Sequence, residues 1–176
     1  EIYGKFMQEP LRILHVVTSM SRAGLETMLM NYYRAIDRSK IQFDFLVHRD
    51  KEGDYDNEIR SMGGRIYHLP SISFAHLIDY NKRACDFFVN HPEYSIVHSH
   101  LDSLSALPLA AAKKANISTR IAHSHTSNFD SGLKKPIRNM TKRLIPKYAT
   151  DFFGCSDEAI EFIFGKRAAK NGIVIN

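Results

Sequence analysis

Two histidine pairs are the residues of this sequence whose type and spacing best suit chemistry. His98 and His100 flank one serine, and His123 and His125 flank another. Both pairs end short apolar runs of the kind that form strands, in which side chains two positions apart point to the same face. Adjacent strands lie about 4.8 Å apart, so the imidazoles should gather at one edge of a sheet. Grouped imidazoles can hydrogen-bond a sugar hydroxyl or a phosphate, act as bases or bind zinc.

Zinc binding is the weaker of these interpretations. A zinc site would normally add a carboxylate or a thiolate, and the nearest acids, Asp102 and Asp130, match no strong metal motif. We therefore predict no metal site, and keep a zinc-dependent hydrolase that uses both histidine pairs as an alternative. Serine hydrolysis is not favoured because the sequence has no G-x-S-x-G motif. The remaining histidines are interpreted as structural: His15, His48, His68, His76 and His91.

A second candidate site is the small, polar loop Thr18–Glu26, which leads into a predicted helix. The free N–H groups and the dipole at a helix N-terminus favour an anion such as phosphate. Gly24 would let the backbone approach a ligand closely, and Arg22 would add positive charge. A plain turn is the alternative, because the loop contains neither G-x-G-x-x-G nor G-x-x-x-x-G-K-[ST].

A parallel sheet would bring these segments together. Short β-rich apolar runs alternate with helical patterns, which is typical of βαβ units. The predicted strands are Ile13–Val17, Phe43–Val47, Arg65–Leu69, Ile96–His98, Arg120–His123, Asp151–Cys155 and Ile173–Ile175. The first helix has its predicted buried face at Leu25, Leu29, Tyr32 and Ile36. The predicted fold class is α/β, a Rossmann-like parallel sheet of about seven strands flanked by helices.

Length and composition fit one globular domain. The chain has 176 residues, of which 44% are apolar and 24% charged, which excludes a disordered chain. We assign residues 11–176 to one domain and treat residues 1–10 as an upstream extension. The net charge of +5 falls short of the basic excess of nucleic-acid-binding proteins, so no nucleic-acid partner is predicted.

The sequence has the character of a cytoplasmic protein. No apolar run reaches the ~20 residues of a membrane span, and the first residues lack the order of a signal peptide. Cys85 and Cys155 lie in apolar contexts and are predicted to be buried, reduced thiols. The chain stops on the predicted strand Ile173–Ile175, so we expect a boundary with a second domain there.

Five short motifs carry a family resemblance. They are, in chain order, Leu11–Thr18, Arg22–Glu26, Ile96–His100, Arg120–Thr126 and Phe153–Ala159. In this order, and in their placement at strands, they resemble the amino-terminal half of the family-4 retaining glycosyltransferases, most of all the capsular and exopolysaccharide branch. The resemblance spans Leu11 to Asn176 and implies one half of a GT-B enzyme, which has two Rossmann-like domains.

The resemblance implies a role for each matching residue. His125 matches the family's histidine that touches the donor sugar and is needed for transfer, and His123 is the nearby alternative. Gly24, with Arg22, matches the loop that approaches the donor diphosphate, although Ala23 stands where the family usually has a glycine. The residues placed on the acceptor side are His98, His100, His123, Thr126 and Ser127.

The resemblance also implies a reaction. A hexose would pass from a nucleotide sugar, UDP-linked, to a polysaccharide or lipid-linked acceptor with retention, and without a metal or another cofactor. The family's donor-binding glutamates belong to the second domain, so this chain should not transfer sugar unaided. A non-catalytic nucleotide- or lipid-binding module remains an alternative.

Residues 131–150 combine an apolar stripe with basic side chains. The stripe, predicted to pack on the sheet, contains Leu133, Ile137, Met140, Leu144 and Tyr148. The basic residues are Lys134, Lys135, Arg138, Lys142, Arg143 and Lys147. Ser131-Gly132 is predicted to open this helix, and Pro146 to kink or end it. The basic residues are either an ordinary solvated surface or rest on an anionic membrane, which would make the protein peripheral to the inner face of the membrane.

Overall fold

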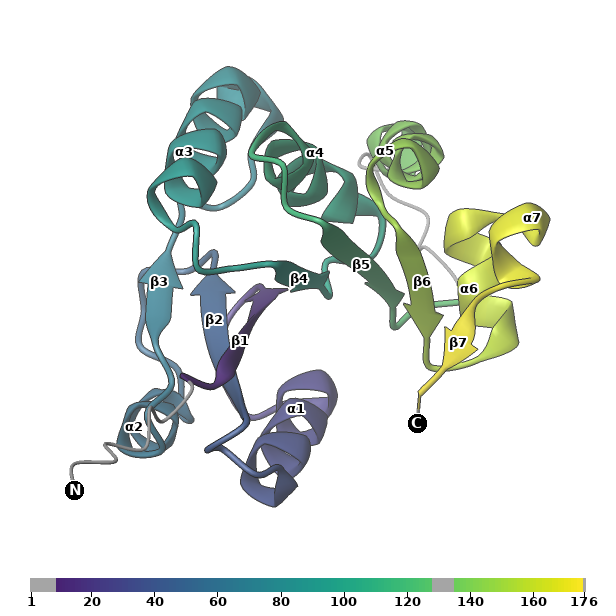
Figure 1. Ribbon diagram of the computed structural model, residues 1–176. Coiled ribbons are helices and arrows are strands. Elements are labelled where there is room, and N and C mark those ends of the chain that lie inside the picture. The colour runs from purple at the N-terminus through teal and green to yellow at the C-terminus, as the bar shows by residue number, and fades with distance from the viewer. Residues whose placement is uncertain (1–8, 128–134, 176) are drawn as a thin grey trace, which may run out of the picture.

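The computed structural model describes residues 9–127 and 135–175. Seven parallel strands form one sheet in the order β3-β2-β1-β4-β5-β6-β7 (Figure 1). The strands are β1 Leu11–Val17, β2 Ile41–Val47, β3 Ile66–His68, β4 Ile96–Ser99, β5 Thr119–Ser124, β6 Asp151–Gly154 and β7 Ile173–Val174. The α-helices are α1 Gly24–Ala35, α2 Asp56–Ser61, α3 Leu77–Asn90, α4 Ala106–Lys114, α5 Lys135–Tyr148, α6 Asp157–Phe164 and α7 Lys166–Ala169, with 3₁₀ turns at η1 Phe74–His76 and η2 Asp102–Ser105. The predicted α/β fold with seven strands is confirmed.

Helices cover the two faces of the sheet unequally. Figure 1 shows α3, α4 and α5 along one face, and α1 and α2 on the other face near β1, β2 and β3. The chain builds outward from β1 to β3 and then returns to place β4 on the opposite side of β1. Strand order therefore reverses between β1 and β4. Open α/β sheets bind ligands at this point, outside the carboxyl ends of the strands.

Alternating residues of the strands supply two separate cores. Leu14 and Val16 of β1 belong to a core that also contains residues of α3, α4, α5 and α6. Val17, Phe43 and Phe45 belong to the core beneath α1 and α2. Apolar side chains on both faces are what a parallel sheet flanked by helices requires.

A buried ion pair joins the neighbouring strands β1 and β2. Asp44 of β2 is 0% exposed and accepts two hydrogen bonds from the Arg12 guanidinium of β1, both 2.6 Å long. The Tyr94 hydroxyl donates to the same carboxylate at 2.6 Å, and the backbone N–H of Arg65 donates at 2.7 Å. The pKa of Arg12 is raised, first by its hydrogen bonds to Asp44. The carboxylate is therefore fully satisfied, as a buried charge must be.

Two local predictions were wrong, those for Tyr32 and Cys155. Tyr32 was placed on the buried face of α1, but it is 41% exposed, and Met30 and Tyr33 are buried instead. Pro146 lies in the last turn of α5, which ends two residues later at Tyr148, close to the predicted end of the helix. Cys155 is exposed rather than buried.

The apolar stripe of α5 was also misplaced in part. Met140 is 54% exposed and Leu144 is 37% exposed, whereas Thr141 and Ile145 face the core. The predicted helix start at Ser131-Gly132 lies outside the described residues. Among the described helices, none is both long and apolar enough to cross a bilayer.

Candidate functional site

Five histidines cluster at the carboxyl edge of the central strands. His15 lies on β1 and is paired in register with His98 of β4. His100 follows β4, His123 lies on β5, and His125 follows β5. The positions on each strand are two apart, so their side chains lie on one face of the sheet, the face that carries α1. The structure brings both predicted pairs together and adds a residue that the sequence analysis interpreted as structural, His15.

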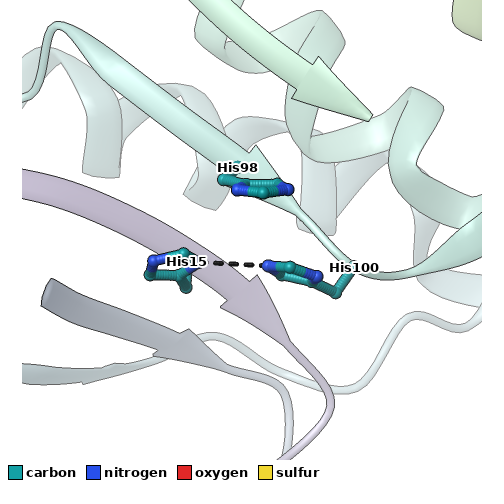
Figure 2. Close-up of side chains that lie close together, drawn as sticks. All are labelled: His15, His98 and His100. Atoms are coloured by element: carbon teal, nitrogen blue, oxygen red, sulfur yellow. Dashed lines mark hydrogen bonds between the residues drawn. The ribbon is translucent and has the colours of Figure 1, made fainter. Parts of the chain in front are cut away.

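The imidazoles are hydrogen-bonded to one another. His15 Nδ1 shares a hydrogen bond of 3.0 Å with His100 Nε2, and His100 Nδ1 shares another of 3.0 Å with His125 Nε2. A separate hydrogen bond of 3.1 Å joins His98 Nε2 and His123 Nδ1. Figure 2 shows the His15–His100 bond with the ring of His98 beside it. The cluster therefore consists of a chain of three rings and a pair.

Ring stacking links the chain and the pair. The centroids of His98 and His100 lie 4.2 Å apart, and those of His123 and His125 lie 4.1 Å apart. All but His125 are buried, and His125 is half-buried at the outer end of the chain. His125 is thus the member of the cluster best placed to meet a ligand.

Burial keeps these imidazoles uncharged. Desolvation lowers the pKa of His15 to about 3, of His123 to about 2 and of His125 to about 4. The pKa values of His98 and His100 also fall well below the usual value, again mainly through desolvation, with repulsion from neighbouring imidazoles added. At neutral pH each ring therefore has one N–H donor and one nitrogen lone pair.

Asp102 holds the strand end that carries His125. Its Oδ1 accepts the backbone N–H of His125 at 2.7 Å, and it has a left-handed backbone with φ of 46°. Desolvation raises the pKa of Asp102, opposed by the N–H groups of His125 and Thr126. The sequence indicates Asp102 only as a possible zinc ligand, and this positioning role was not predicted. The signal available in the sequence for this role was the position of Asp102, an acidic residue two positions after His100.

The polar residues after His125 lie at the same edge. The hydroxyl of Ser124 donates to the carbonyl of Thr126 at 3.1 Å, which fixes the turn that follows β5. Thr126 is half-buried, and Ser127, where this described segment ends, is exposed.

The predicted phosphate loop lines a hollow of about 630 Å³. Arg22, Gly24 and Tyr55 are among its residues. The helix α1 begins at Gly24 without a side-chain cap, and a Cβ at Gly24 would meet no atom within 4 Å. The backbone N–H of Arg22 donates to the Asp54 carboxylate at 2.9 Å, and the side chain of Arg22 is exposed. This helix N-terminus is therefore open to a ligand.

A second hollow, of about 340 Å³, runs beside the histidines. Its apolar lining residues include Ile13, Ile96, Ile121, Phe153 and Ile175. Four of the clustered histidines also line it: His15, His98, His100 and His123. Met28 and Tyr32 of α1 line both hollows. The phosphate loop and the histidine cluster are therefore adjoining parts of one surface.

The basic residues of α5 lie on the opposite face of the sheet from α1 (Figure 1). Lys142 Nζ donates to the carbonyl of Phe162 at 3.1 Å and lies 4.4 Å from the centre of its ring. Arg143 and Lys147 are exposed. Lys134 lies outside the described residues, and Lys135 begins the helix. Helix α5 also packs against η2, and the charge of Arg138 helps to lower the pKa of Asp102, so the first part of the basic segment approaches the residue that holds His125.

The sequence is similar to two proteins named as glycosyltransferases. It is 37% identical over 158 residues to EpsF of Bacillus subtilis (strain 168), which covers 88% of this chain and 41% of EpsF. It is 25% identical over 135 residues to CapH of Staphylococcus aureus, named as a capsular polysaccharide biosynthesis glycosyltransferase, which covers 77% of this chain and 36% of CapH. No family model matches the chain. The chain spans less than half the length of either relative.

Solved structures share the fold. HepE of Anabaena in complex with UDP and glucose superposes with a TM-score of 0.62 at 13% identity, over 94% of this chain and 44% of HepE. Its complex with UDP-glucose gives a TM-score of 0.63 at 14% identity, over 93% of this chain and 43% of HepE. MurG of Acinetobacter baumannii gives 0.51 at 10% identity, over 82% of this chain and 41% of MurG. The chain is therefore similar, over less than half of their length, to proteins named as glycosyltransferases, and it shares the fold of less than half of HepE and MurG.

Proposed function

We propose that this chain is the amino-terminal, acceptor-side domain of a family-4 retaining glycosyltransferase. The complete protein would transfer a hexose from a UDP-linked sugar to a polysaccharide or lipid-linked acceptor. EpsF and CapH are named for glycosyl transfer, and HepE was solved with UDP-glucose. The second domain would make most of the contacts that bind the donor nucleotide.

One observation carries the proposal. A neutral, half-buried His125 follows β5 at the carboxyl edge of the sheet, one strand beyond the point where strand order reverses. It is hydrogen-bonded to His100, which lines a hollow that shares Met28 and Tyr32 with the hollow at Gly24. The two groups suit different parts of one ligand. Free N–H groups and the dipole of α1, with Arg22, would bind a diphosphate. An uncharged imidazole would hydrogen-bond a sugar hydroxyl.

The neighbouring residues would position these groups. His100 Nδ1 shares a hydrogen bond with His125 Nε2, and Asp102 accepts a hydrogen bond from the His125 backbone N–H. These two contacts fix the position of the His125 ring. Thr126 and Ser127 would face the acceptor. His98, His100 and His123 line the same edge but are buried, and they would act mainly through His125. Retention by front-face attack needs no side-chain nucleophile, and positioning and charge stabilisation would be the contribution of this domain.

Substitution of His125 tests this function. In the complete protein, His125→Ala should lower kcat/KM for UDP release from the UDP-sugar substrate by about ten- to a thousand-fold, equivalent to ~1.4–4 kcal/mol. The melting temperature should stay within about 2 °C. His76→Ala, on the exposed turn η1, is the matched control and should keep full activity. Wild-type kcat/KM in a folded His125→Ala variant would contradict the proposal.

We also propose that α5 docks the protein on an anionic membrane. Met140 and Leu144 are exposed on the same helix as the exposed Arg143 and Lys147. Basic side chains near an anionic leaflet contribute about 1 kcal/mol each, and exposed apolar side chains add to this attraction. Docking of this kind would keep the protein cytoplasmic and peripheral, near lipid-linked acceptors.

A further inference from the structure

The histidine cluster contains buried ring nitrogens that no protein atom satisfies. Among the described residues, the Nε2 atoms of His15 and His123 are buried and have no hydrogen-bond partner. His123 is only 1% exposed. An unpaired polar atom in this position costs free energy unless something binds it. Contact with a donor sugar at His125 does not account for the free nitrogen of His123.

Three of the imidazoles converge on one point. One ring nitrogen each from His100, His123 and His125 lies within 4.8 Å of the corresponding nitrogens of the other two. His100 Nδ1 and His125 Nε2 are 3.0 Å apart. Two nitrogens bound to one tetrahedral zinc ion are about 3.3 Å apart, given Zn–N bonds of about 2.05 Å. A small outward movement of these rings would open the space for an ion.

The other two histidines are placed as supports for these three. A metal-bound imidazole almost always hydrogen-bonds through its second nitrogen, which fixes its tautomer and orientation. The second nitrogen of His100, Nε2, already pairs with His15 Nδ1 (Figure 2). The second nitrogen of His123, Nδ1, already pairs with His98 Nε2. His123 Nε2 is therefore the nitrogen left to bind, while His15 Nε2 stays without a partner.

We propose that His100, His123 and His125 bind one divalent transition-metal ion of the zinc class, with His15 and His98 orienting two of the ligands. Three imidazoles without a carboxylate suit zinc, cobalt, nickel or copper, and not magnesium or calcium, which prefer oxygen. The half-buried His125 provides the entrance. A second candidate triad, His15, His98 and His100, is buried throughout, whereas the first includes the half-buried His125.

This inference goes beyond the proposed function and does not depend on it. The two do interact: an ion bound at His125 Nε2 would replace the hydrogen bond to His100 Nδ1 and would place a cation beside the ring that is proposed to meet the sugar. A bound ion should therefore inhibit transfer rather than assist it. Metal binding is measured without any activity assay, so the two proposals fail separately.

The test is metal titration of the complete protein, purified without a histidine tag and stripped with EDTA. With ZnCl₂ in a calorimeter, the wild type should bind one ion more than His125→Ala does, with a Kd below about 1 μM. With CoCl₂, the wild type should develop the visible absorption of tetrahedral cobalt. His98→Ala should bind about 10- to 100-fold more weakly, because it removes a supporting residue and keeps all three ligands. His76→Ala should match the wild type.

Each outcome decides the proposal. Equal zinc stoichiometry and affinity in wild type and a folded His125→Ala variant would overturn it, as would the absence of a cobalt spectrum in the wild type. The cobalt spectrum is measured on the wild type, without any substitution. The proposal can therefore still be refuted if a variant fails to fold. Inhibition of UDP release by zinc in the wild type, relieved by EDTA, is the further expected result.

Discussion

Acid should destabilise this domain between pH 6.5 and pH 5, because its buried histidines are neutral when folded and bind protons when unfolded. The folded pKa values are about 3 for His15, about 2 for His123 and about 4 for His125, against 6.5 for an unperturbed imidazole. A group whose pKa is lowered by folding contributes full stability above the unfolded pKa. That stability is lost as the pH falls toward the folded pKa.

The magnitude follows from the proton balance. Each imidazole that gains a proton only on unfolding lowers the free energy of unfolding by about 1.36 kcal/mol per pH unit. From pH 6.5 to pH 5 this is about 2 kcal/mol for each of the three, or about 6 kcal/mol in total. A domain of this kind has a free energy of unfolding of about 5–15 kcal/mol, so the loss is a large part of the whole. Stopping at pH 5 keeps most carboxylates ionised.

Urea unfolding followed by circular dichroism, in EDTA and at several pH values, measures this slope. The wild type should lose at least about 4 kcal/mol per pH unit below pH 6, because His98 and His100, whose pKa values are also lowered, add to the three histidines counted above. His125→Asn should reduce the slope by about 1.4 kcal/mol per pH unit, and His76→Asn, which changes an exposed histidine, should leave it unaltered. A free energy of unfolding that stays level between pH 7 and pH 5 would refute the conclusion that the cluster is buried and neutral.

Three further predictions address the ion pair, the positioning acid and the membrane face. Arg12→Met leaves the Asp44 carboxylate buried without its cation and should lower the free energy of unfolding by about 3–5 kcal/mol in urea titrations at pH 7. A loss below about 1 kcal/mol would mean that Arg12 contributes little to the stability of the buried carboxylate. Asp102→Ala should lower kcat/KM for UDP release, and Asp102→Asn, which keeps an acceptor oxygen for the His125 backbone, should recover most of it; equal loss in both variants would argue against this hydrogen bond. Phosphatidylglycerol vesicles should co-sediment the wild type at low salt but not at high salt, and Arg143→Glu/Lys147→Glu should reduce binding; equal recovery of both proteins would leave α5 an ordinary surface.

The sheet was predictable because each strand carries its own local signal. The seven apolar, β-rich runs were recognised within a few residues of their observed bounds, and the two His-x-His pairs were placed at neighbouring strand ends. Parallel pairing of β4 with β5 then brings the pairs together. These features depend on short stretches of chain and on the two-residue repeat of a strand.

Features that depend on strand order were not predictable in the same way. His15 is a single histidine in the first strand, and it joins the cluster because β1 lies beside β4. In the sequence His15 is 85 residues from His100, to which it is hydrogen-bonded. Asp102 reaches the His125 backbone through a turn with a positive φ, which no local pattern announces. On α5, the helical repeat was recognised but its orientation was not, since tertiary contacts decide that Thr141 and Ile145 face inward.

A crystal structure of the complete protein with its UDP-sugar donor bound would test the proposed function most directly. We predict that the hexose lies within hydrogen-bonding distance of His125, about 3 Å, and that the diphosphate lies against the N-terminus of α1 at Gly24. A donor held entirely by the second domain, with its sugar out of reach of His125 and its diphosphate away from Gly24, would contradict the proposal.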